Sequence, residues 1–79
     1  MNIDDAKRMF ETGVLESAMV MRDSSGTGWL VQFQASGTGV SPFLETARGE
    51  PRRFQSLDFV AKALQAIGFR QFTVFVETA

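Results

Sequence analysis

The stretch Arg52–Gly68, RRFQSLDFVAKALQAIG, constrains the fold more than any other part of the chain. Ser56 is a residue type that favours the start of a helix, and Gly68 is a type that favours its end. Between them, apolar residues recur every three or four positions, as on a helix with one buried face. The recurring residues are Leu57, Val60, Ala61, Leu64 and Ile67. The pattern predicts a helix over residues 57–67 that packs on a sheet.

The residues on either side of this helix show the two-residue period of strands. Strands are predicted over residues 15–22 and 29–35, and the second of these is the cleanest alternation in the chain. A third strand is expected over roughly 42–47. Residues 52–55 return as an extended segment, and the pattern leaves open whether they form a regular strand. A final strand is predicted over 70–77.

A second, shorter helix is predicted over residues 3–12, where apolar and charged side chains separate onto two faces before Gly13. The sequence SGTG occurs at both 25–28 and 36–39. Both copies lead into strands and not into helices, which favours hairpin loops over phosphate-binding loops. We therefore expect a single α+β domain over residues 1–79. Its antiparallel sheet has four or five strands and two helices, in the order α-β-β-β-(β)-α-β.

The composition excludes several kinds of chemistry. The 79 residues contain no cysteine, histidine or tyrosine, so thiol catalysis, histidine general acid–base catalysis and a conventional zinc site are ruled out. The remaining candidates are the neighbouring acids Asp4 and Asp5, the pair Ser24 and Ser25, and Lys62. None has a partner at catalytic spacing, so we expect a protein that is not an enzyme and that uses no metal or cofactor.

The chain has neither a basic, apolar leader at its start nor an apolar run of the ~20 residues that a membrane helix needs. The sequence therefore predicts a cytoplasmic protein with no membrane partner.

Apolar residues occur on both faces of three predicted strands. Along each strand the side chains alternate between the two faces, and four apolar residues fall on the face opposite to their apolar neighbours: Met19, Met21, Leu30 and Phe75. A sheet with one face in water does not need them, so each face should be covered. The helix over 3–12 could cover the second face, a second copy of the chain could cover it, or another partner could do so. Methionine is common at interaction sites because its side chain adapts its shape. These four residues are therefore the candidate interface of a homodimer or protein-interaction module.

Basic residues gather in the second half of the chain, although the net charge is −1. Residues 45–70 hold five bases against three acids, and the bases are Arg48, Arg52, Arg53, Lys62 and Arg70. Three strands followed by a helix, with arginines near the strand ends, are similar to the DNA-reading sheets related to plant AP2 and integrase arm-binding domains. This resemblance implies that the five bases contact phosphates. Gln32 and Gln34 stand where such sheets present arginines, so DNA binding is the less favoured alternative.

The run ETARGEPRRFQSLDFVAKALQAIGF and the preceding strand GWLVQFQ resemble a family of small proteins carried by plasmids and integrative elements of proteobacteria. These proteins are often described as partition-associated, or ParC-like. The resemblance covers roughly residues 14–76 and has no catalytic signature. It implies a small cytoplasmic accessory protein in plasmid maintenance or gene transfer, and it assigns no role to any single residue.

Overall fold

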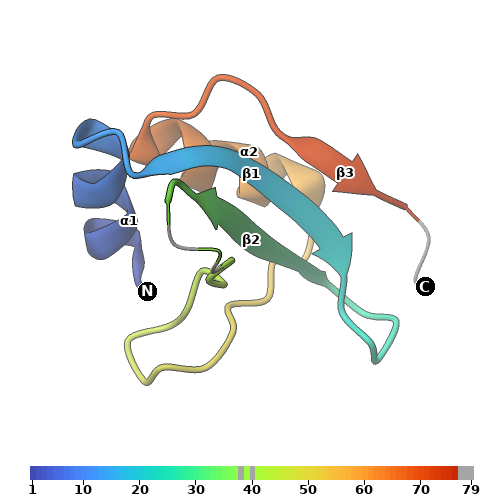
Figure 1. Ribbon diagram of the computed structural model, residues 1–79. Coiled ribbons are helices and arrows are strands. Elements are labelled where there is room, and N and C mark those ends of the chain that lie inside the picture. The colour runs from blue at the N-terminus through green and yellow to red at the C-terminus, as the bar shows by residue number, and fades with distance from the viewer. Residues whose placement is uncertain (38, 40, 77–79) are drawn as a thin grey trace.

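The computed structural model describes residues 1–37, 39 and 41–76. It contains two helices and a mixed sheet of three strands (Figure 1). The elements are α1 (Ile3–Glu11), β1 (Leu15–Arg22), β2 (Trp29–Ala35), α2 (Leu57–Ile67) and β3 (Thr73–Phe75). An α+β domain with two helices was expected, and this part of the prediction is confirmed.

Both helices begin where the sequence predicted. The Asn2 side chain accepts a hydrogen bond from the Asp5 amide at 2.9 Å and caps α1. Ser56 accepts from the Phe59 amide at 3.3 Å and caps α2. These bonds satisfy amides that otherwise have no partner in the first turn of a helix. Gly68 ends α2 with a φ of 131°, a conformation that is costly for any residue with a Cβ atom.

The core lies between the helices and one face of the sheet, which we call the inner face. From the sheet it receives Ala18, Val20, Val31 and Phe33, and from α2 it receives Val60, Leu64 and Ile67, all of them buried. Burying each larger side chain contributes about 2 kcal/mol. Ala6 of α1 belongs to the same core, so both helices pack toward the inner face (Figure 1). The first helix therefore does not cover the opposite face.

A bulge near the start of β1 sets which side chains face inward. Leu15 pairs with Ala35 and Ser17 pairs with Gln34, so Glu16 is an extra residue without a partner on β2. Such an insertion shifts the alternation of the strand by one position. It allows Leu15 and Ala18, which are three residues apart, both to be buried.

The prediction of four or five antiparallel strands was wrong in number and partly in direction. The sheet order is β2-β1-β3, and β3, which follows α2, runs parallel to β1 and antiparallel to β2. Only residues 73–75 of the expected final strand pair with β1. Its last expected residue, Glu77, lies outside the described residues, as does Thr38 of the second SGTG loop.

The expected strands over 42–47 and 52–55 form isolated bridges along the free edge of β2. Phe43 pairs with Gln32, and Phe54 pairs with Trp29. Between these bridges the chain leaves the sheet edge in a short excursion closed by the bridge between Glu45 and Pro51. The interruption prevents a continuous ladder, although both segments still cover the edge of β2. Leu44, which directly follows Phe43, is fully buried.

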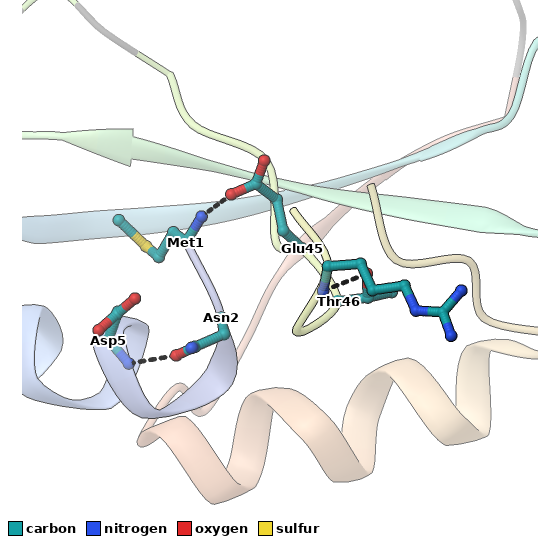
Figure 2. Close-up of polar contacts among 6 residues, drawn as sticks. Met1, Asn2, Asp5, Glu45 and Thr46 are labelled. Carbon is teal, nitrogen blue, oxygen red and sulfur yellow. Dashed lines mark hydrogen bonds and ion pairs between the residues drawn. The ribbon is translucent and has the colours of Figure 1, made fainter. Parts of the chain in front are cut away.

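Polar contacts fix this excursion to the start of α1. Figure 2 shows the Met1 amino group paired with the Glu45 carboxylate. The Glu45 amide also donates to the Met1 carbonyl at 2.7 Å. The Thr46 amide donates to the Glu50 carbonyl at 2.8 Å and closes the turn. The segment between β2 and α2 is therefore held against both the sheet edge and the first helix.

Candidate interaction surfaces

The sheet face opposite the helices, which we call the outer face, brings the four candidate interface residues together. Leu30, Met21 and Phe75 lie directly opposite one another on β2, β1 and β3 and form one row across the sheet. Met19 lies in the next row. Met19, Met21 and Leu30 are half-buried, and Phe75 is 48% exposed. No described helix covers this row.

The second row adds Phe43 and Thr73, which the sequence pattern alone did not mark as members of this face. Phe43, Gln32, Met19 and Thr73 follow one another from the β2 edge to β3. Phe43 shares this face because Gln32 lies directly opposite it, whereas the next residue, Leu44, points into the core. The alternation of Phe43 and Leu44 was visible in the sequence, but only the pairing with β2 shows which face Phe43 joins.

The paired rows of the outer face contain no charged side chain. Their members are Ser17, Met19, Met21, Leu30, Gln32, Gln34, Phe43, Thr73 and Phe75. Charged residues lie around these rows: Glu16 and Arg70 line a cavity with Ser17 and Thr73, and Glu50 lines a hollow with Leu30. Ser17 Oγ donates to Gln34 Oε1 at 3.3 Å, and Gln32 Nε2 donates to the Ser41 carbonyl at 2.9 Å. The face therefore has an uncharged, apolar centre and charged residues at its margin.

Charge begins at the margin of the outer face, where Asp23 and Arg53 form an ion pair of 2.6 Å. Both residues line a small hollow with Leu30. The Ser25 hydroxyl donates to Asp23 Oδ2 at 2.7 Å. This hydrogen bond, together with the Arg53 guanidinium, holds the pKa of Asp23 below its ordinary value, although burial acts to raise it. Ser25 therefore supports a turn and has no basic partner of the catalytic kind among the described residues.

A second surface lies in the helix layer, where segment 52–55 faces the two helices. We call it the basic groove, and its volume is about 550 Å³. It is lined by Ile3, Arg52, Arg53, Phe54, Gln55, Phe59, Lys62 and Ala63. Phe59 is 52% exposed, an unusual position for a phenylalanine on a helix that packs on a sheet.

The five candidate nucleic-acid contacts do not form one surface. Arg52, Arg53 and Lys62 meet at the basic groove, although Arg53 is paired with Asp23. Arg48 lies on the exposed turn after Thr46, and Arg70 lines a separate cavity of about 710 Å³ beside the first half of β1. Arg53 and Arg70 both reach the margin of the outer face, Arg53 beside Leu30 and Arg70 beside Ser17 and Thr73.

No described helix is long and apolar enough to span a bilayer. Comparison of the chain with protein-family models, with curated proteins and with solved structures finds no match. The two surfaces must therefore be interpreted from their own chemistry.

Proposed function

We propose that this protein is a non-enzymatic interaction module that forms a homodimer through the outer face of its sheet. The observation that carries the proposal is the row of Leu30, Met21 and Phe75, which crosses three strands at the uncharged centre of this face without a covering helix. The centres of protein interfaces are depleted in charge and enriched in methionine and aromatic residues. This face has the same composition, and the ion pair at its margin corresponds to a polar rim.

A second copy is the occupant that this face fits best. A two-fold axis brings the same patch of both subunits together, so a patch must complement itself. The uncharged rows of the face can meet their own copy without placing like charges opposite each other at the centre. Two such sheets can pack face to face at about 10 Å, with their strands within about 30° of each other. Flexible methionines near the centre can adjust to one another across such a contact.

The size of the outer face predicts a weak dimer. At about 3.4 Å per residue and about 4.8 Å between strands, the three strands and the bridged edge segment span only about 300 Å² in projection. Stable complexes bury about 800 Å² of accessible surface on each partner. We therefore expect a dissociation constant in the micromolar range, about 10 to 100 µM.

Sedimentation equilibrium over a dilution series from about 500 µM to about 5 µM tests the proposal. The mean mass should fall from that of a dimer toward that of a monomer. Phe75→Lys should leave a monomer throughout, because it places a charge in the apolar row. Val76→Lys is the matched control: it adds the same charge one position along, at a residue that is already 72% exposed.

A strict monomer at the highest concentration would rule out the dimer, and equal loss in both lysine variants would rule out the outer face as its interface.

We further propose a role in the maintenance of plasmids or other mobile elements, in line with the resemblance of residues 14–76 to partition-associated proteins. Loss of an element from cells that lack this protein, restored by the wild type but not by Phe75→Lys, would support that role. An unchanged loss rate would contradict it. The alternative of DNA binding through the sheet has less support, because two of the five candidate bases, Arg53 and Arg70, lie at the margin of the outer face, and Asp23 pairs with Arg53.

A further inference from the structure

The basic groove combines an apolar floor with two cations held above aromatic rings. The Arg52 guanidinium lies 5.4 Å from the centre of the Phe54 ring. The Lys62 ammonium lies 5.8 Å from the centre of the Phe59 ring. No acidic side chain lines the groove among the described residues. The groove therefore presents positive charge and apolar surface side by side.

The charge of the groove is available to a ligand. The ion pairs that the structure gives for the described residues use the Met1 amino group, Arg8 and Arg53, and none uses Arg52 or Lys62. Both residues are exposed, and neither side chain forms one of these ion pairs, which a ligand would have to break. A carboxylate entering here would gain charge-assisted hydrogen bonds, because the planar guanidinium of an arginine can donate to both carboxylate oxygens.

The aromatic residues are poorly placed to stack nucleic-acid bases. Single-strand binding uses rings whose faces are open to the bases. Phe54 is only 7% exposed, and Arg52 already lies over its ring. The surface is also hollow and not protruding, so it would not insert into a lipid surface as an amphipathic helix does. A protein segment with an apolar side chain fits the concave shape.

We infer that the basic groove is a docking site for a segment of a partner protein in which a carboxylate stands next to an apolar side chain. The apolar side chain lies against Ile3, Phe59 and Ala63, and the carboxylate lies between Arg52 and Lys62. The site belongs to the helix layer; of the residues that line it, Arg53 also lies at the margin of the outer face, and the proposed contacts do not use Arg53. It therefore does not depend on the dimer proposed above.

Selection of a random library of peptides, each about twelve residues long, on the immobilised protein tests the inference. The expected result is enrichment of peptides that combine Asp or Glu with an aromatic or aliphatic residue. A selected peptide, titrated into the ¹⁵N-labelled protein, should shift the amide resonances of Gln55, Phe59 and Lys62 and leave those of Met21 and Leu30 in place.

Matched variants separate the charge from the apolar contact. Lys62→Glu should weaken binding of the selected peptide at least about 10-fold, and Phe59→Ser should have a similar effect. Lys62→Met keeps most of the side-chain stem and should give a smaller loss. Lys7→Glu on α1 makes the same change in net charge outside the groove and should leave binding within about 2-fold of the wild type.

Three results would overturn the inference: selected peptides without acidic residues, equal losses in Lys62→Glu and Lys7→Glu, and resonance shifts confined to the outer face. Titrations with a thymidine oligonucleotide and with vesicles of anionic lipid complete the test. Binding of either at the groove, more tightly than the selected peptide, would show that the site serves nucleic acid or membrane and would refute the protein partner.

Discussion

The outer face and the basic groove lie in different layers of one small domain and use different forces. The centre of the outer face is uncharged, and its apolar row is assembled from three strands. The basic groove is concave and positively charged, and it is assembled from α1, α2 and segment 52–55. Among the described residues, four large apolar side chains are the most exposed; of these, Phe59 lines the basic groove and Phe75 lies in the row of the outer face, whereas Leu57 and Val76 belong to neither surface. Leu57 and Phe59 lie on α2, and Phe75 and Val76 lie on or after β3.

Exposed apolar surface therefore favours different kinds of partner in the two regions of this molecule. Without charge, it favours a partner with the same surface, because burial of apolar area is non-directional. Beside cations, it favours a partner of opposite charge, because electrostatic complementarity selects which molecule binds. Variants that act on one surface and spare the other can therefore test both proposals.

Gly68→Ala should have the largest effect, and it should damage both surfaces together. A Cβ atom at this position would lie 2.6 Å from Cε2 of Phe10, and the φ of 131° is unfavourable for alanine. We expect the free energy of unfolding to fall by about 2 to 3 kcal/mol in urea denaturation. Because Gly68 connects α2 to the chain that leads to β3, dimerisation and peptide binding should weaken in parallel with stability.

The control for this variant is Gly13→Ala. Gly13 also has a positive φ, of 81°, but its Cβ atom would meet nothing within 4 Å. A loss of about 1 kcal/mol is expected from the backbone alone. Equal losses in the two variants would show that contact with the Phe10 ring contributes nothing.

Met21→Lys should separate the two surfaces most sharply. Met21 is the middle residue of the apolar row, and a buried ammonium there would have no partner. The dissociation constant of the dimer should rise at least about 100-fold in sedimentation experiments. Affinity for the selected peptide should stay within about 2-fold, because the groove lies in the other layer. A comparable loss at both surfaces would contradict their independence.

Salt should act on the groove and spare the outer face. Raising NaCl from about 50 mM to about 500 mM shortens the screening length from about 14 Å to about 4 Å. Isothermal titration should then give about 10-fold weaker peptide binding, whereas the dissociation constant of the dimer should change by less than about 2-fold. A dimer that dissociates in salt would point to the ion pair at the margin and not to the apolar row.

Asp23→Asn should have the smallest effect on binding and a distinct effect on acid stability. Removing the carboxylate releases Arg53, so acidic peptides should bind about 2- to 3-fold more tightly at the groove. The pKa of Asp23 is lowered in the folded protein, so its contribution is present at neutral pH and is lost as pH falls below about 4. The variant should therefore lose less stability than the wild type between pH 7 and pH 3 in urea denaturation. An unchanged acid dependence would show that this ion pair does not support the fold.

Local patterns predicted the helices and the two long strands closely. Ser56 and Gly68 bound α2, and the predicted ranges 15–22 and 29–35 are those of β1 and β2. These elements depend on capping and on periodicity, which are properties of neighbouring residues. The residues of the candidate dimer interface were also chosen from the alternation of side chains along the strands. The structure places all four on one face: Met19, Met21, Leu30 and Phe75.

Errors arose where distant segments had to meet. Residues 42–47 and 52–55 have extended patterns, but the excursion between Glu45 and Pro51 interrupts their pairing with β2. The direction of β3 depends on the path of α2 across the sheet, which no local pattern records. The basic groove was missed for the same reason. Arg52 and Lys62 are ten residues apart in sequence and share a surface only because α2 folds back beside segment 52–55.

Local patterns in the sequence are enough to place the helices, to set the inward phase of the long strands and to put apolar side chains on both sides of the sheet. Three features depend on the folded chain: both helices cover the same side, β3 runs parallel to β1, and two cations share a groove with Phe59. The two groups of features differ in the distance along the chain over which the forces act. Capping and periodicity act over a few residues, whereas the choice of face and partner depends on which distant apolar surfaces are buried together, and that is decided by the free energy of the whole chain.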